Sequence, residues 1–330
     1  MSPTSRPGKT KFQIDLRRHL REHYVNENLT HLICEIAEAS KYIIHSISTG
    51  DLGVAGTSNL YGEQQLELDV LADRIMRKRL DHSRVVANMM SEEMDEIIPV
   101  SPDCDGKYSV AFDPLDGSSL VDVNLAVGTI VSIFEGCDLL QPGRNQVAAV
   151  YILYGPRTTL VYSVGKGVHE FGMNMLREYT LLQENITLEP QGNLYSPGGQ
   201  RNLYTPGVEA YIHKLEDRGV KLRYSGGFVP DINQILLKGQ GIFFYPHLQN
   251  QPQGKLRLLF ELSPMAFLIE QAGGAASDGR RPILDLQPQQ IHERSPVFIG
   301  CKEDVALAKE FIRKFEDGKG DPAEKNVKKS

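Results

Sequence analysis

Amphipathic helices and short buried strands alternate along this chain, and this alternation restricts its fold more than any other feature. Apolar residues recur at three- and four-residue steps over 29–47 and again over about 65–80, as on one face of a helix. Apolar runs of strand length follow at 85–90, 108–112, 128–134, 147–154 and 158–164. The second half continues with predicted helices over 205–218, 263–272 and 304–315 and a strand over 241–245. Such an alternation predicts layered α/β sheets, although it does not give the order of the strands.

The segments between these elements divide the chain. Ser263 and Pro264 precede one predicted helix and Gly273-Gly274 follow it, so we expect Ser263 to be its N-cap. The glycine-rich stretch 50–65 is predicted to be a long loop. A polar segment with several prolines and glycines, 181–201, predicts a domain boundary. We therefore expect an N-terminal domain over 1–185, a C-terminal sugar-phosphate-binding domain over 186–318, a disordered tail over 319–330 and a disordered start through about residue 20.

Composition excludes several classes of protein. The chain has 330 residues, of which 41% are hydrophobic and 24% charged, as in a soluble globular protein of about two domains. Its net charge of -6 argues against binding to nucleic acid or to a membrane surface. The four cysteines lie far apart, which excludes a disulfide framework and a cysteine-rich zinc module and indicates a reducing compartment. No stretch reaches the ~18–20 apolar residues that span a bilayer, and no signal peptide precedes the first helix, so a cytoplasmic location is expected.

Several acidic groups stand out, and two of them, Glu92-Glu93 and Asp113 with Asp116, follow predicted strands, whereas Asp69 lies on a predicted helix and Glu261 just before another. Six acids form the candidate set: Asp69, Glu92, Glu93, Asp113, Asp116 and Glu261. Carboxylates attract Mg²⁺ or Mn²⁺, which prefer oxygen ligands. Without a cation, carboxylates placed together repel and raise each other's pKa, so such a cluster indicates a metal site. Each acid alone could be a solvated turn or helix residue, and Glu261 could balance Lys255 or Arg257; the prediction depends on the whole set and its order.

The segment DPLDGSS combines metal-binding and phosphate-binding features. Asp113 and Asp116 are three residues apart in a tight turn, Pro114 fixes the backbone between them, and the carbonyl of Leu115 can point the same way. The following residues, 117–119, offer backbone N–H groups and two hydroxyls, which would favour a phosphate if a helix begins there. The alternative is an ordinary Pro-Gly turn capped by Asp113. Histidine, serine and cysteine show no nucleophile-and-base setting, so a covalent mechanism is not expected.

The order of these motifs resembles that of the lithium-sensitive, magnesium-dependent phosphatases, in which LELDVLADRI precedes SEE and FDPLDGSS follows about twenty residues later. Within that superfamily, four longer segments resemble class I fructose-1,6-bisphosphatases: VAFDPLDGSSLVDVNLAVGTI, LQPGRNQVAAVYILYGPRTT, LRYSGGFVPDINQ and GKLRLLFELSPMAFLIEQAGG. The resemblance extends from about residue 12 to residue 316. It implies a layered α-β-α-β-α sugar-phosphatase fold of two α/β domains, usually in a homotetramer, and a role in gluconeogenesis through hydrolysis of the 1-phosphate of fructose 1,6-bisphosphate.

The resemblance also implies a role for each matching residue. Two or more Mg²⁺ ions per subunit, or Mn²⁺ in their place, would be held by Glu92, Asp113, Asp116, Glu261 and the carbonyl of Leu115. Two further acids would orient and deprotonate the attacking water, Asp69 and Glu93. The substrate contacts would be Gly117, Ser118, Ser119, Tyr224, Tyr245 and Lys255, with Arg223 reaching into the site of a neighbouring subunit.

Animal members of the family bind AMP at an inhibitory site, and the matching positions are altered in this chain. Lys107 and Tyr108 match two residues of that site, but Glu135 stands where an arginine is expected, and Asn26-Glu27 replaces a Thr-Gly pair. A carboxylate facing a nucleotide phosphate is repulsive, so we expect weak or absent inhibition by AMP.

The substrate pocket departs from the family pattern at NLYSPGGQR, which stands where many members have an Asn-Glu-Gly-Tyr-like segment. This segment is more similar to sedoheptulose-1,7-bisphosphatases, whereas GIFFYP keeps Tyr245 as in fructose bisphosphatases. Fructose 1,6-bisphosphate is the expected substrate, and the alternatives are sedoheptulose 1,7-bisphosphate or both. A non-catalytic regulator that binds sugar phosphates is a further alternative, against which the complete acidic set argues.

Overall fold

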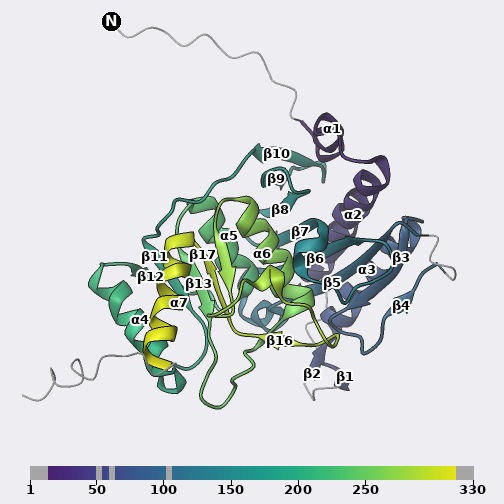
Figure 1. Ribbon diagram of the computed structural model, residues 1–330. Coiled ribbons are helices and arrows are strands. Elements are labelled where there is room, and N and C mark those ends of the chain that lie inside the picture. The colour runs from purple at the N-terminus through teal and green to yellow at the C-terminus, as the bar shows by residue number, and fades with distance from the viewer. Residues whose placement is uncertain (1–13, 50–53, 59–63, 102–105, 317–330) are drawn as a thin grey trace, which may run out of the picture.

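The computed structural model describes residues 14–49, 54–58, 64–101 and 106–316. Two β-sheets and the helices around them form five layers in the order α-β-α-β-α (Figure 1). The layered α/β fold predicted from the sequence is therefore confirmed. None of the described helices is long and apolar enough to cross a membrane.

The larger sheet has eight strands in the order β10-β9-β8-β7-β6-β5-β3-β4. Their bounds are Val86–Ser91 for β3, Ile98–Pro99 for β4, Tyr108–Asp116 for β5, Val127–Glu135 for β6, Gln146–Tyr154 for β7, Thr158–Ser163 for β8, His169–Met173 for β9 and Tyr179–Gln183 for β10. Its neighbours pair antiparallel except for β3 and β5, which run parallel. The carboxyl ends of those two strands therefore meet at one edge.

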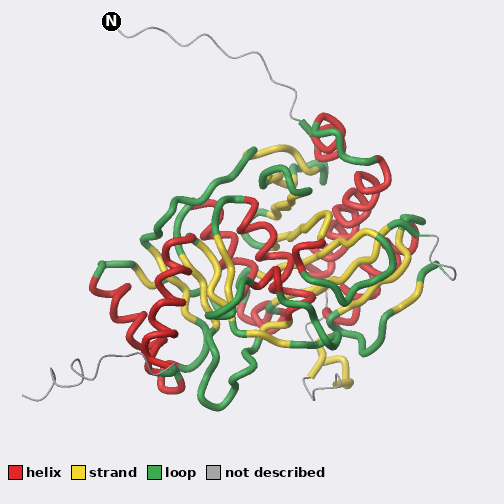
Figure 2. The backbone as a smooth tube through the Cα atoms, in the orientation of Figure 1, coloured by secondary structure: helices red, strands yellow, loops and turns green. Residues whose placement is uncertain are grey.

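The two faces of this sheet contribute to different cores because side chains alternate along each strand. Val131 and Ile133 of β6 pack with three N-terminal helices, whereas Ile130 packs on the opposite face. These helices are α1 (Leu16–Glu22), α2 (Glu27–Thr49) and α3 (Glu67–His82). Helices α5 (Phe228–Lys238) and α6 (Ser263–Gln271) cover the other face and separate the two sheets (Figure 2).

The smaller sheet has five strands in the order β12-β11-β13-β17-β15. Their bounds are Leu194–Pro197 for β11, Lys221–Leu222 for β12, Ile242–Tyr245 for β13, Ala275–Ser277 for β15 and Val297–Gly300 for β17. Helices α4 (Pro206–Asp217) and α7 (Lys302–Glu316) cover its outer face (Figure 1). Two short antiparallel pairs complete the sheets: β1 (Val54–Ser58) with β2 (Gln64–Leu66), and β14 (Leu256–Arg257) with β16 (Arg294–Ser295).

Several local predictions were wrong. The stretch 50–65 is not a continuous loop, because its residues 54–58 pair with 64–66 as strands. Residues 14–20, part of the predicted disordered start, are instead structured, and Asp15 caps α1 by accepting a hydrogen bond from the backbone N–H of Arg18 at 2.9 Å. Residues 1–13 and the predicted tail over 319–330 lie outside the described residues.

Two further corrections concern one helix and one cysteine. Ser263 is not an N-cap, since a π-helical turn, Leu258–Leu262, leads directly into α6 and gives Ser263 helical backbone angles. Cys137 is disulfide-bonded, whereas Cys34 and Cys301 are free thiols. The cysteines are thus not uniformly reduced, although a multi-bridge framework is absent from the described residues.

Candidate active site

The parallel junction between β3 and β5 brings the first acids together. Glu92 directly follows β3, and its backbone N–H donates to the carbonyl of Phe112 in β5 at 2.9 Å. Asp113 follows Phe112, so the two acids lie side by side where the strands end. Since β5 continues to Asp116, the motif DPLDGSS leaves the sheet at this same edge.

A cavity of about 410 Å³ opens over this edge. All six predicted acids line it: Asp69, Glu92, Glu93, Asp113, Asp116 and Glu261. They come from α3, from the β3 and β5 ends and from the π-helical turn before α6. Leu115 also lines the cavity. Segments nearly 200 residues apart in the sequence thus build one acidic surface.

Three of the acids form a tight group. Asp113, Asp116 and Glu261 are all buried, and each can offer a carboxylate oxygen within 4.8 Å of the other two. Backbone N–H groups position all three side chains. Leu115 donates to Asp113 at 2.9 Å, Val229 to Asp116 at 2.9 Å, and Arg257 to Glu261 at 2.6 Å. Fixed carboxylates at such distances could share a cation.

Burial raises the pKa of each of these carboxylates. It raises the pKa of Asp116 to about 6 and, together with the charge of Asp116, that of Glu261 to about 7. Burial and then neighbouring acids raise the pKa of Asp113 well above its ordinary value. Burial also raises the pKa of Glu92, although the guanidinium of Arg257 forms an ion pair with it and opposes the shift. A divalent cation would remove this repulsion, and a set of oxygen donors alone fits Mg²⁺ or Mn²⁺.

The predicted phosphate contacts line the same cavity beside the acids. Gly117 has a φ of 76°, in the left-handed region that favours glycine, and a 3₁₀ helix over Ser118–Val123 begins directly after it. Gly117, Ser118 and Ser119 all line the cavity. The short helix that the sequence left open as a possibility is therefore present.

The predicted contacts with the sugar and its second phosphate lie on the side of the smaller sheet. Tyr245 ends β13, Lys255 places its Nζ 5.7 Å from the centroid of the Tyr245 ring, and both line the cavity with Tyr224. Gly198 supports Tyr245 closely, since a Cβ added at Gly198 would lie 2.3 Å from Cδ2 of that ring. The SPGG segment, which departs from the family pattern, thus packs against the ring of Tyr245.

Arg223 is the one predicted site residue that does not line the cavity of its own chain. Its side chain is exposed, and its guanidinium donates to the carbonyl of Leu222 at 2.8 Å. It follows β12 at the edge of the smaller sheet, where it could extend toward another molecule.

Two arginines of the cavity were not assigned a site role from the sequence. Arg257 pairs with Glu92, and Arg294 lies opposite Arg257 across the β14–β16 pair and donates to the carbonyl of Lys255 at 3.0 Å. The sequence offered Arg257 only as the partner of an acid inside the fold. It gave no signal for Arg294, a single arginine in a two-residue strand.

The positions matched to the AMP site lie at the opposite end of β5. Tyr108 begins β5 and pairs across the ladder with Glu135, the last residue of β6. Burial first, and then Glu135, raise the pKa of the Tyr108 hydroxyl. The side chain of Glu135 itself is exposed.

Comparisons with known proteins agree over nearly the whole chain. Residues 9–184 match the family model described as fructose-1-6-bisphosphatase, N-terminal domain, and residues 188–313 match the one described as its C-terminal domain. A relative from Geobacter sulfurreducens named fructose-1,6-bisphosphatase class 1 is 70% identical over 310 residues, which cover 94% of this chain and 99% of the relative. A relative of the same name from Syntrophotalea carbinolica is 71% identical over 93% of this chain and 96% of its own length.

Solved structures agree as well. Fructose-1,6-bisphosphatase from Leishmania major in its holo form superposes with a TM-score of 0.86 at 31% identity, over 91% of this chain and 99% of that one. A putative sedoheptulose-1,7 bisphosphatase from Toxoplasma gondii superposes with a TM-score of 0.83 at 30% identity, over 90% of this chain and 98% of that one.

Proposed function

This chain belongs to the fructose-1,6-bisphosphatase family, and we propose that it hydrolyses the 1-phosphate of fructose 1,6-bisphosphate to give fructose 6-phosphate and phosphate. The observation that carries the proposal is the shared cavity. Six acids from separate elements line it together with the hydroxyls of Ser118 and Ser119 and the ammonium group of Lys255. Such a cavity suits a substrate with one phosphate beside the acids and a second phosphate at the ammonium group of Lys255.

Glu92, Asp113, Asp116, Glu261 and the carbonyl of Leu115 would hold two or more Mg²⁺ ions, or Mn²⁺ in their place. Bound divalent ions neutralise phosphoryl oxygens, lower the pKa of water and stabilise the departing alkoxide. The backbone hydrogen bonds to Asp113, Asp116 and Glu261 keep these carboxylates oriented before the ions arrive.

Asp69 and Glu93 would orient the attacking water and take its proton. Asp69 projects from α3 and is only 5% exposed, so its carboxylate is largely shielded from bulk water. Ser118, Ser119 and the backbone at Gly117 would bind the 1-phosphate that is cleaved. No covalent phosphoenzyme is needed, because water attacks the phosphorus directly.

Lys255, Tyr245 and Tyr224 would bind the sugar and its 6-phosphate. Binding of this remote phosphate would fix the position of the one that reacts. Arg223 would complete this pocket from a neighbouring subunit, so we propose a homotetramer in which that arginine is shared. The exposed position of Arg223, outside the cavity of its own chain, supports this assignment.

The seven-carbon alternative is not favoured. The relatives that are 67–71% identical to this chain are named fructose-1,6-bisphosphatase class 1. A non-catalytic role is not favoured either, since every acid that the reaction needs lines the cavity. The cytoplasmic location stays a prediction, which cell fractionation would test.

The test is phosphate release from fructose 1,6-bisphosphate and sedoheptulose 1,7-bisphosphate, measured side by side with Mg²⁺, with Mn²⁺ and with EDTA. We expect a strong preference for the six-carbon substrate and loss of activity on chelation. Lys255→Met should raise KM for the bisphosphate, whereas Lys302→Met, an exposed lysine at the start of α7, should not. Equal turnover with EDTA, or a preference for the seven-carbon substrate, would contradict the proposal.

A further inference from the structure

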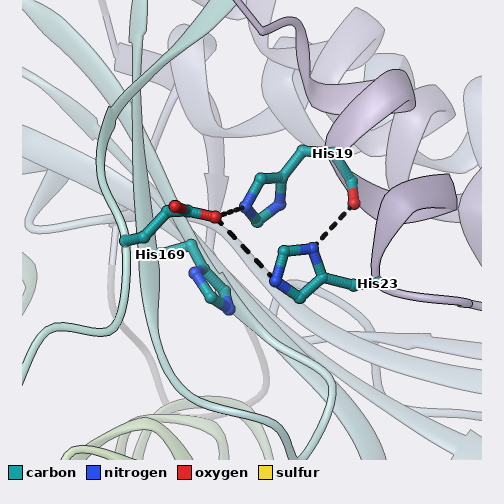
Figure 3. A group of neighbouring side chains, drawn as sticks. His19, His23 and His169 are labelled. Carbon is teal, nitrogen blue, oxygen red and sulfur yellow. Dashed lines mark hydrogen bonds and ion pairs between the residues drawn. The ribbon is translucent and has the colours of Figure 1, made fainter.

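Three histidines and a glutamate meet far from the acidic cavity. His19 projects from α1, His23 follows that helix, His169 begins β9, and Glu184 follows β10. Each can offer one ligand atom, and these atoms all lie within 4.8 Å of one another. Figure 3 shows the three imidazole rings gathered at this junction. We refer to these four residues as the histidine cluster, and none of them has a part in the phosphatase reaction.

The rings of the cluster are packed together. The ring centroids of His19 and His23 are 4.1 Å apart and stacked, and that of His169 lies 4.7 Å from His19 and 5.1 Å from His23. Three imidazolium ions could not share this space, because like charges at such distances repel. Burial accordingly lowers the pKa of His19, and it lowers that of His169 to about 4. Neutral imidazole is the form that binds metal ions.

Hydrogen bonds at the outer nitrogens set which ring nitrogen is free to bind. Nδ1 of His23 lies 3.0 Å from the backbone carbonyl of His19, which can only accept, so the proton is on Nδ1 and the lone pair on Nε2. Nε2 of His169 likewise donates to the carbonyl of Lys166 at 3.1 Å. The lone pair of His169 is then on Nδ1, where the backbone N–H of Asn185 makes a long contact of 3.4 Å.

His19 has the third such outer partner. Its Nδ1 lies 2.6 Å from the hydroxyl of the buried Tyr162, and its Nε2 lies 2.8 Å from Oε1 of Glu184. Without a metal, the Nε2 proton is donated to the carboxylate. Because the tyrosine hydroxyl can accept as well as donate, the ring can instead carry its proton on Nδ1 and present a lone pair at Nε2. A metal ion would then replace one proton between His19 and Glu184.

This pattern is typical of protein metal sites, in which each histidine ligand donates its other N–H to a carbonyl or a similar acceptor. The spacing also fits. Tetrahedral ligands at 2.0–2.1 Å from Zn²⁺ lie about 3.3 Å from one another. In the cluster, Nε2 of His19 is 2.8 Å and Nε2 of His23 is 3.9 Å from Oε1 of Glu184. Side-chain shifts of about 1 Å would close the set.

The charge of the histidine cluster and its exposure to solvent also favour a metal site. The hydrogen bond from His19 lowers the pKa of Glu184, so the carboxylate stays ionised. The side chain of Glu184 is 44% exposed and that of His23 is 29% exposed, which gives an ion a route from solvent. Three imidazoles and one carboxylate suit Zn²⁺ and neighbouring ions rather than Mg²⁺.

We propose that His19, His23, His169 and Glu184 form a binding site for Zn²⁺ or a neighbouring divalent ion such as Co²⁺. The bound ion would join α1 to the edge of the larger sheet. An ion there would link four side chains from three separate segments. Outside the side chains, the contacts between α1 and this edge include a backbone bridge between Asp15 and Thr180. A bound ion should therefore hold α1 on the sheet more firmly.

The test is Zn²⁺ binding to the purified full-length chain after treatment with EDTA. Saturating Mg²⁺ is added to occupy the acidic cavity, and bound Zn²⁺ is measured by competition with a chromophoric chelator. We expect one Zn²⁺ per chain in the wild type and at least tenfold weaker binding in His23→Ala and in Glu184→Gln. Both variants change partly exposed side chains, so folding should be preserved. Co²⁺ in place of Zn²⁺ should give the intense visible absorption of a tetrahedral site, and both variants should lose it.

His213→Ala is the matched control, because His213 is an exposed histidine that lies near two glutamates of α4, Glu209 and Glu216. It should bind Zn²⁺ as the wild type does. Hydrogen exchange gives a second readout, since Zn²⁺ should slow the exchange of α1 amides in the wild type and in His213→Ala only. The proposal is overturned if the wild type binds no Zn²⁺ in the presence of saturating Mg²⁺. It is equally overturned if binding is unchanged in His23→Ala and Glu184→Gln, or if it is lost in His213→Ala.

Discussion

Replacing Glu261 by glutamine is expected to stabilise the metal-free protein and to abolish its turnover. Glu261 is 6% exposed, and its Oε2 accepts a hydrogen bond from the backbone N–H of Arg257 at 2.6 Å. Glutamine keeps an oxygen that can accept this bond but removes the charge that repels Asp116. The substitution therefore separates the electrostatic cost of the site from its hydrogen bonding.

The magnitude follows from the pKa of Glu261, which burial and then Asp116 raise from 4.5 to about 7. Below pH 4.5 the carboxyl group is protonated in both the folded and the unfolded chain, so its ionisation costs no stability. As the pH rises from 4.5 to about 7, the unfolded chain releases the proton and the folded chain keeps it. The folded state then loses about 1.4 kcal/mol for each pH unit, and the loss of about 3 kcal/mol is complete above pH 7.

The assay is urea unfolding in EDTA at pH 8 and at pH 4.5. At pH 8, Glu261→Gln should be more stable than the wild type by about 1–3 kcal/mol, less than the full loss because removing one charge also relaxes its neighbours. At pH 4.5 the difference should vanish. Adding Mg²⁺ at pH 8 should raise the unfolding midpoint of the wild type and leave that of the variant nearly unchanged.

Glu303→Gln is the control, since Glu303 is an exposed acid in the first turn of α7. It should show no gain at pH 8 and the normal response to Mg²⁺. If Glu261→Gln were less stable than the wild type in EDTA at pH 8, repulsion within the acidic group would not be the cost inferred here. An equal response of both proteins to Mg²⁺ would refute the assignment of Glu261 as a ligand.

The other predictions concern turnover, substrate binding and regulation. Asp116→Asn should retain less than about a tenth of the wild-type kcat, a barrier increase above about 1.4 kcal/mol, with an unchanged circular dichroism spectrum; a higher residual rate would contradict its role in holding metal. Gly198→Ala should raise KM for fructose 1,6-bisphosphate more than it lowers kcat, because the added methyl group would displace the ring of Tyr245; steady-state kinetics with an unchanged KM would show that this wall does not position the substrate. AMP titrations should show weak or no inhibition, and Glu135→Arg should increase it; tight inhibition of the wild type would overturn the argument from Glu135.

The acidic set could be predicted from the sequence because its members follow recognisable elements. The motif DPLDGSS directly continues a buried strand, and SEE directly follows another. What the sequence could not give was their pairing in space. That pairing depends on β3 and β5 lying next to each other in parallel, and on a π-helical turn that brings Glu261 within reach of Asp113 and Asp116.

The histidine cluster shows the opposite case. His19 and His23 are close in sequence, but His169 and Glu184 come from about 150 residues later and lie in no motif with them. The sequence also predicted disorder through about residue 20, because the basic and polar start masks the short apolar face of α1. Leu16 and Leu20 are both buried, and this contact with the sheet edge holds α1 in place. Long-range packing, rather than local pattern, created the cluster.

The arrangement of the cavity follows one rule in both sheets. Glu92 and Asp113 stand at the carboxyl end of the parallel pair β3 and β5, and Tyr245 ends β13, which runs parallel to β11. Ligand groups gather where the carboxyl ends of neighbouring parallel strands meet. Four of the acids, Glu92, Glu93, Asp113 and Asp116, thus end or follow strands of the larger sheet, whereas Tyr245 ends a strand of the smaller one. Because the layer of α5 and α6 lies between the two sheets, it would set the separation of the two phosphates in the proposed complex, and so the length of substrate that can fit.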